Sequence, residues 1–223
     1  MVLCCISAEW LTAIGTVGTV IIALFLPLIR IHWYRPKFTF SSSKKDNCVE
    51  EVVTQLDTSE HEKMVKIRLR ITNIGRGVAR SVSFYVDSYK QKRGDESFVQ
   101  QNFLPTKLKN HRGEFIQSIV PQLNYFVDVA CVRKSDEMSV ENGSGKAKQF
   151  YKLYIPTEPE GFRELGVGTF VIPVKCYSEN VSGVSIAYLK ILWDDSKGCT
   201  TDPQNFSVSI ISESNYNNLK KGE

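Results

Sequence analysis

The hydrophobic pattern of the chain changes character once, close to residue 36. Residues 10–28 read WLTAIGTVGTVIIALFLPL, without a charged residue, and Ile29 extends this apolar run to 20 residues. At the helical rise such a run spans about 30 Å, the thickness of a bilayer core. Amphipathic aromatic residues, which anchor membrane helices at the interface, flank it: Trp10, Trp33 and Tyr34. The pattern predicts one transmembrane helix within residues 1–35.

A cleaved signal peptide is the alternative interpretation of this segment. Such a peptide needs a basic start, a shorter apolar stretch and small residues at the cleavage site. Residues 1–9 contain no Lys or Arg, the apolar run is longer, and a bulky basic segment follows it. These differences favour a retained anchor.

The charges around the helix predict its direction. Basic residues follow it closely and none precedes it: Arg30, Arg35, Lys37, Lys44 and Lys45. Because basic flanks stay in the cytoplasm, we expect the inner (plasma) membrane, with the N-terminus outside and the C-terminal domain cytoplasmic. Three N-glycosylation sequons, at Asn142, Asn180 and Asn205, would matter only for a lumenal domain. Chance matches are expected in a chain this rich in Asn, Ser and Thr.

After Pro36 the pattern becomes an alternation of apolar and polar residues. From Val65 to Ile71 the apolar side chains occupy every second position, with Lys66, Arg68 and Arg70 between them. This period of two predicts a strand with one face on a core and one face in water. Seven similar segments follow the same rule: residues 37–41, 82–86, 125–131, 151–155, 170–176, 189–193 and 206–210.

About eight short strands with polar turns predict an all-β antiparallel sandwich at residues 36–212. The polar residues 213–223 are expected to be a flexible tail. The stretch ITNIGRGVARSVSFYV has an Asn-x-Gly-x-Gly-x-Ala core in which Asn73 bridges its own turn. There we expect Gly75 and Gly77 to supply positive φ and Ala79 to fit a tight crossover between sheets.

This turn resembles the strand-turn-strand of immunoglobulin-like sandwiches in bacterial adhesion and cell-envelope modules. The late ILWDDSKG segment is similar to such domains as well. The whole layout of anchor, Arg/Pro juxtamembrane stretch and sandwich resembles a group of small, uncharacterised bacterial or phage single-pass membrane proteins. The resemblance implies an immunoglobulin-like fold and transfers no active-site residue.

Two sets of residues are candidate contact surfaces. Small residues share one face of the anchor, where they would let membrane helices associate, including into a homo-oligomer: Thr12, Gly15, Thr16, Thr19 and Ala23. Basic residues could contact anionic lipid or an acidic partner: Arg30, Arg35, Lys37, Lys66, Arg68 and Arg70. A solvated strand face that deters edge pairing is the alternative for the last three.

Catalytic and metal-binding patterns are not evident in the sequence. The histidines His32, His61 and His111 are scattered, and no P-loop, GxSxG or HExxH motif occurs. The pair Asp194-Asp195 with Asp202 could bind calcium, although a polar turn explains them better. The six cysteines show no zinc spacing, and Cys131 and Cys176 are read as buried thiols, with an inter-sheet disulfide as the alternative.

The charge balance does not favour a nucleic-acid partner, and the lack of a recognisable catalytic motif in the sequence favours a binding role over an enzymatic one. The net charge of +4 over 223 residues is too balanced to indicate nucleic acid. We therefore expect a membrane-tethered, non-enzymatic protein-interaction module without cofactor or metal, whose partners are membrane lipids and an unidentified protein. The alternative is a membrane effector of the defence or toxin type, in which the sandwich senses a ligand and the helices oligomerise to perturb the bilayer.

Overall fold

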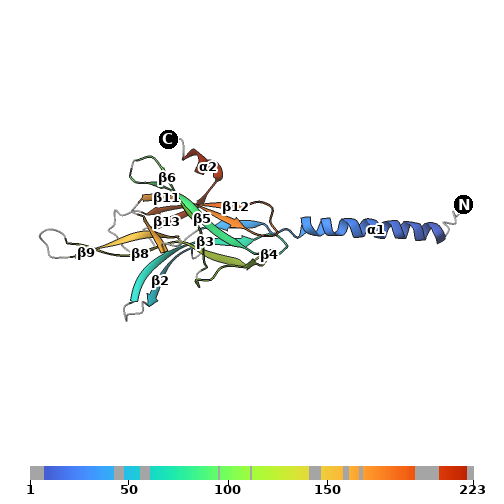
Figure 1. Ribbon diagram of the computed structural model, residues 1–223, viewed down its shortest axis with the longest axis horizontal. Coiled ribbons are helices and arrows are strands. Elements are labelled where there is room, and N and C mark those ends of the chain that lie inside the picture. Colours follow the sequence, from blue (N-terminus) through green and yellow to red (C-terminus); the bar gives the residue numbers. More distant parts are fainter. Residues whose placement is uncertain are drawn as a thin grey trace.

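The chain forms one long N-terminal helix and a β-rich domain (Figure 1). The computed structural model describes residues 8–42, 48–55, 61–94, 96–110, 112–140, 147–157, 161–165, 168–193 and 206–219. Helix α1 (Ala8–Trp33) projects away from the strands. Its segment Thr12–Ile29 is long and apolar enough to cross a membrane, and none of it is buried by the rest of the chain.

The larger sheet is antiparallel and has the order β1-β3-β8-β9-β10, with β2 also paired to β3. Its strands are β1 (Phe38–Ser41), β2 (Val49–Gln55), β3 (His61–Asn73), β8 (Asn124–Val140), β9 (Ala147–Thr157) and β10 (Gly161–Leu165). Strand β8 takes one edge of β3, and β1 and β2 divide the other edge. At the break between them, Arg68 N–H donates to Cys48 O at 2.7 Å. This bond keeps the edge continuous.

The second large sheet is also antiparallel, in the order β13-β12-β11-β5-β6. Its strands are β5 (Ser83–Lys92), β6 (Val99–Lys107), β11 (Gly168–Tyr177), β12 (Ser185–Trp193) and β13 (Phe206–Ile211). A small third sheet pairs β4 (Ala79–Arg80) with β7 (Ser118–Ile119). Strand β4 lies in the crossover from the first sheet to the second, and Ala79 is fully buried there, as the tight connection requires.

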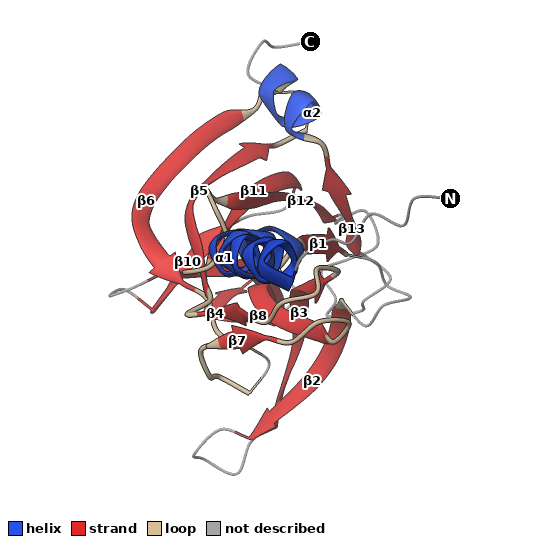
Figure 2. Ribbon diagram, turned by 90° about the vertical axis from the view of Figure 1, so that its right-hand side faces the viewer, coloured by secondary structure: helices blue, strands red, loops and turns tan. Residues whose placement is uncertain are grey.

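The two large sheets share one hydrophobic core. The alternating residues of β3, among them Ile67 and Leu69, are fully buried and belong to the same cluster as Phe84 of β5 and Phe170 of β11. Viewed along α1, strands β11, β12 and β13 lie above the helix and β2, β3 and β8 below it (Figure 2). The period-two pattern therefore brings apolar faces of both sheets against each other, as hydrophobic burial demands.

Each of the eight predicted strand segments overlaps an observed strand, although residues 37 and 82 lie just outside theirs, and most of the observed strands are longer than predicted. The described residues contain five further strands, namely β2, β4, β6, β7 and β10. Strands β4 and β7 are two residues long, while β2, β6 and β10 pair along only one side. Such strands bury few side chains, so the sequence shows little alternation to identify them.

A second helix occupies part of the predicted polar tail. Helix α2 (Glu213–Asn218) begins after Ser212, whose side chain accepts a hydrogen bond from Asn215 N–H. Tyr216 is its buried residue, and its ring stacks on Tyr188 of β12 at 4.4 Å. The contact fixes α2 against the outer face of the five-stranded sheet. Residues 220–223 lie outside the described residues.

Candidate functional site

The junction between α1 and the β domain is built around Asn73, the last residue of β3. Its side chain is fully buried, and Oδ1 accepts hydrogen bonds from Lys37 N–H at 3.1 Å and Gly75 N–H at 3.0 Å. Its Nδ2 donates to Gly77 O at 2.7 Å and Ile119 O at 3.2 Å. One amide therefore connects the segment after α1, its own turn and β7. We call the turn 73–77 with the segment 34–37 the juxtahelical clamp.

The two glycines of this clamp are required by close approach, not by backbone conformation. The residues with positive φ do not include Gly75 or Gly77, so the expectation of positive φ at these positions is wrong. A Cβ on Gly75 would lie 2.3 Å from Arg35 O, and one on Gly77 would overlap Tyr34 O at 1.7 Å. The backbone of residues 34–37 passes directly over the turn. The Asn73 bridge, by contrast, is present as predicted.

Further contacts hold the end of α1 to the turn. Ile74 N–H donates to Lys37 O at 2.8 Å, so both backbone groups of Lys37 are bonded to the turn. The Arg76 guanidinium lies 5.3 Å from the centre of the Trp33 ring, within the range of a cation–π contact. Pro36, which stands between Trp33 and Lys37 in the sequence, is buried. The helix therefore enters the domain without a flexible linker.

The basic residues of the predicted β3 face are bound by side chains of the neighbouring strands. Arg68 is only 8% exposed, and its Nε donates to Asp128 Oδ1 at 3.0 Å while Nη1 pairs with Glu50. Lys66 Nζ lies 2.9 Å from the other oxygen of Asp128, and Arg70 Nε donates to Ser41 Oγ at 2.7 Å. These pairs hold β3 to β8, β2 and β1. At about 3.3 Å per residue, Lys66 also lies roughly 23 Å along β3 from Asn73.

The basic residues next to the helix are placed differently. Arg35 and Lys37 are exposed at the clamp, where each stands within four residues of Trp33. Arg30 belongs to α1, and its side chain lies outside the described residues. The structure therefore brings Arg35 and Lys37 together with Arg76, and separates them from Lys66 and Arg68.

The small residues of α1 share one exposed face, as their spacing predicts. Thr12, Gly15, Thr16, Thr19 and Ala23 are all exposed. Thr16 Oγ1 donates to Thr12 O at 2.9 Å, and Thr19 Oγ1 donates to Gly15 O at 2.7 Å. No atom lies within 4 Å of a Cβ placed on Gly15, so its side of the helix is open. These threonines satisfy their hydroxyl donors within the helix, which leaves a smooth face.

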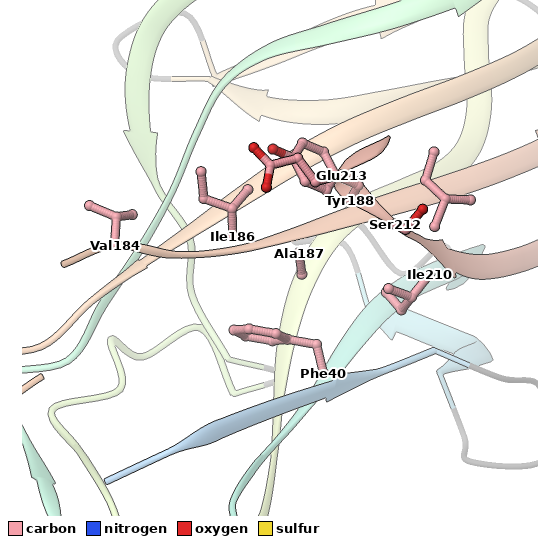
Figure 3. A pocket seen from close by; sticks show the side chains of 9 residues that line it. Phe40, Val184, Ile186, Ala187, Tyr188, Ile210, Ser212 and Glu213 are labelled. Carbon is pink, nitrogen blue, oxygen red and sulfur yellow. The ribbon is translucent and has the colours of Figure 1, made fainter. Parts of the chain in front are cut away.

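A pocket of about 420 Å³ lies where the two sheets approach one another beside α2 (Figure 3). Its lining, which presents both polar and apolar atoms, comes from β1, from residues 184–188 at and just before the start of β12, and from residues 210–213 at the end of β13 and the start of α2: Phe40, Val184, Ile186, Ala187, Tyr188, Ile210, Ile211, Ser212 and Glu213. The Glu213 carboxylate is its charged group. The composition suits an apolar side chain that carries a positive group at its end. The sequence showed no motif for this pocket, because its lining comes from three distant segments.

A buried cation stabilises the wall next to this pocket. Lys90 of β5 is 1% exposed, and its Nζ donates to Tyr216 O at 2.5 Å and lies 3.7 Å from the centre of that ring. Burial raises the pKa of the Tyr216 and Tyr188 hydroxyls, so both rings are neutral at pH 7. The lysine therefore docks α2. The sequence did not reveal this role, because position 90 continues the apolar alternation of Phe84 and Val86, and the register shift between Val86 and Ser88 places Tyr89 in the core instead.

The described part of the chain contains few groups placed for metal binding or thiol chemistry. No three His, Cys, Asp or Glu side chains cluster there as a metal site requires. Burial raises the pKa of the Cys176 thiol to about 12, and Cys176 is a free thiol, so the alternative disulfide with Cys131 is not formed. The calcium alternative at Asp194, Asp195 and Asp202 lies outside the described residues.

Comparison with known proteins adds no family to these observations. No family model, no curated protein and no solved structure matches the chain. Its function therefore has to be argued from the junction, the pocket and the helix themselves.

Proposed function

We propose that the chain is a membrane-tethered, non-enzymatic protein-interaction module with its β domain at the cytoplasmic face. The observation that carries this proposal is the juxtahelical clamp. An apolar helix that is long enough to span a bilayer is joined, without a linker, to a domain that leaves it uncovered. A tether of this kind confines recognition to the membrane surface and sets the orientation of the domain.

We further propose that the domain is an immunoglobulin-like sandwich. Two antiparallel sheets with one shared core support this assignment. The larger sheet differs from the four-stranded ABED sheet of immunoglobulins, because it also contains β2 and β10 and because its connections differ. In the ABED sheet, strand E, the neighbour of B, follows the outer strand D in sequence. Here β8, the neighbour of β3, precedes β9. The proposed relationship therefore concerns the architecture and not every connection.

The cytoplasmic orientation is supported by the distribution of charge and by the sequon at Asn180. The Asn180 side chain has a structural role, because Nδ2 donates to Val78 O at 2.8 Å and Oδ1 accepts from Arg80 N–H at 3.0 Å. The presence of Asn at position 180 is therefore explained by these hydrogen bonds, without a glycan. The exposed Arg35 and Lys37 are the basic flank that the positive-inside rule requires. Protease protection of sealed vesicles tests the orientation, and digestion of the β domain only from the outer side would contradict it.

The pocket beside α2 is the proposed site for a partner's side chain. The decisive experiment compares membranes that contain the full chain, the pocket variant Ile186→Arg and the distant surface variant Val99→Arg. Cross-linking and mass spectrometry identify the neighbouring proteins in each sample. We expect one set of cross-links that Ile186→Arg abolishes and Val99→Arg retains. Identical cross-links in all three samples would contradict the proposed site.

The membrane effector remains a second candidate because of two observations. The small-residue face of α1 is open, and the clamp couples any rotation of the domain to that helix. In a membrane two-hybrid assay, Gly15→Leu or Thr19→Leu should abolish self-association, whereas Val17→Leu on the opposite face should not. An effector should also lose toxicity when an unrelated helix replaces α1, and a tether should retain its cross-links after that replacement.

A further inference from the structure

The end of the β domain that receives α1 exposes four aliphatic side chains. Ile74 and Val78 lie in the turn after β3, and Val120 and Leu123 lie in the connection from β7 to β8. Their exposed fractions are 54%, 39%, 40% and 54%, respectively. We call these four residues the apolar collar. Such a group at one end of a soluble domain calls for an explanation, because exposed aliphatic patches mark contact surfaces.

The two loops of the collar lie side by side next to the helix. Asn73 forms a bridge with Pro121, and Gln122 N–H donates to Asn73 O at 2.9 Å. The same Asn73 binds Lys37 and Gly77 in the clamp. The collar is therefore tied to the helix exit by a single buried residue.

The clamp also fixes the depth of the collar relative to the bilayer. The apolar span of α1 ends at Ile29, and Tyr34, the residue that contacts Gly77, follows five positions later. At about 1.5 Å per residue this interval is roughly 7–8 Å long. The headgroup layer on each side of a bilayer has about the same thickness. The turn therefore lies at the outer edge of the headgroup layer, close enough for its side chains to reach into that layer, and no linker separates the collar from α1.

The charge at this end is of the sign that lipid headgroups attract. Arg35, Arg76 and Arg80 are exposed around the collar. Glu179, which accepts a hydrogen bond from Ser81 Oγ at 2.9 Å, is an acidic neighbour of Arg80. These arginines and the exposed Lys37 outnumber Glu179, and basic side chains close to a bilayer surface bind anionic lipid.

We propose that the apolar collar seats the β domain on the bilayer surface, with Ile74, Val78, Val120 and Leu123 in the headgroup region and the three arginines on anionic headgroups. This inference rests on the membrane anchorage in the proposed function. It goes further, because it makes the domain a peripheral lipid-binding surface as well as a tethered one. The basic residues predicted for lipid contact on β3 are replaced in this role by Arg76 and Arg80.

The test places a photo-crosslinking amino acid at position 74, 123 or 99 of the full chain, reconstituted in vesicles. Val99 is the matched control, because it is 52% exposed but pairs with Gln91 at the far end of β5. That end lies roughly 26 Å along the strand from Ser83. Vesicles of zwitterionic lipid are compared with vesicles that also contain anionic lipid, which gives the cytoplasmic leaflet its negative surface potential. Lipid adducts are quantified by mass spectrometry, and carbonate extraction measures anchorage in the same samples.

We expect lipid adducts at positions 74 and 123 at least tenfold above those at position 99, with a further rise in anionic vesicles. Arg76→Ala together with Arg80→Ala should remove that further rise. Adducts at position 74 equal to those at position 99 in a carbonate-resistant chain would overturn the collar and leave the anchor intact. Adducts to protein instead of lipid would also overturn it. Extraction of the chain by carbonate would contradict the proposed anchorage itself.

Discussion

Replacement of Asn73 by alanine removes the centre of the juxtahelical clamp. The variant loses two acceptor contacts, from Lys37 N–H and Gly75 N–H, and two donor contacts, to Gly77 O and Ile119 O. The alanine side chain cannot replace any of them. Because Asn73 is fully buried, the groups left behind face a small cavity and not bulk solvent.

The expected loss follows from these four contacts. An intramolecular hydrogen bond contributes about 1 kcal/mol net, and a buried polar group left without its partner costs about 1–3 kcal/mol. Water that enters the cavity recovers part of this penalty, so we expect a loss of about 3–5 kcal/mol. That is a large fraction of the roughly 5–15 kcal/mol that stabilises a typical domain. Asn73→Asp should be no better, since its carboxylate would face the two carbonyl oxygens.

Urea unfolding of the full chain in detergent measures this loss. Trp193 is buried and stacks on Phe206 at 5.8 Å, so its fluorescence reports the β core. The matched control is Thr72→Ala, the neighbouring residue, whose hydroxyl makes an exposed hydrogen bond to Asn124 Oδ1. It should cost less than about 1 kcal/mol. Tryptic cleavage after Lys37 should accelerate at least tenfold in Asn73→Ala and stay unchanged in Thr72→Ala.

Two results would refute this reasoning. The first is an Asn73→Ala variant whose unfolding free energy lies within about 0.5 kcal/mol of the control, the range of ordinary surface substitutions. The second is a normal loss of stability with unchanged cleavage after Lys37. In that case Asn73 would support its own turn without holding the segment that follows α1.

The other predictions concern the charged and buried groups of the domain. Arg68→Ala should lower the unfolding free energy by about 2 kcal/mol, because it leaves Asp128 and Glu50 without their shared cation. Arg68→Lys should recover less than half of this loss. Equal stability of the unmodified chain and both variants would show that the network is solvated. Tyr216→Ala should lower the unfolding free energy by about 2–4 kcal/mol, because it uncovers Lys90, whereas Tyr216→Phe keeps the ring and most of the stability. Protection of the 213–219 amides from hydrogen exchange shows whether α2 stays docked. The Cys176 thiol, with its pKa raised from 9.0 to about 12, should escape alkylation at pH 8 in the folded chain. Its contribution to stability is complete below pH 9 and is lost as the pH rises towards 12. A Cys176 adduct in the peptide map of the native protein alkylated at pH 8 would contradict the prediction.

The sequence predicted those parts of the fold that depend on local periodicity. The uncharged run of α1 and the alternation of β3 each repeat one signal many times, and both appear in the structure. Strand β6 gives no such signal, because its sequence VQQNFLPTK is mostly polar and it pairs along one side only. Helix α2 has six residues and one buried side chain, too few for a helical period to be recognised.

The candidate sites depended on contacts between distant residues, which a single sequence does not show. Lys66, Arg68 and Arg70 alternate along the strand as predicted, but Asp128, about 60 positions away in the sequence, forms ion pairs with the first two. The sequence indicated that Gly75 and Gly77 are required in the Asn73 turn, but it suggested positive φ as the cause, whereas the cause is close backbone approach. Their role became evident only when the backbone of Tyr34 was seen to pass over Gly77.

The position of the pocket narrows the kind of partner that the proposed function requires. Phe40, which lines it, pairs with Ile71, two residues from Asn73, or roughly 7 Å along the strand. Val184 and Ile186 enter it from the start of β12, at the same end of the domain. Since the clamp holds Asn73 next to α1, the pocket lies towards the helix-bearing end of the domain, which the proposed anchorage places close to the membrane surface. The partner should therefore present a segment that itself lies close to the membrane, with a basic residue near Glu213. A partner that is a bulky soluble domain would collide with the bilayer before it reached the pocket.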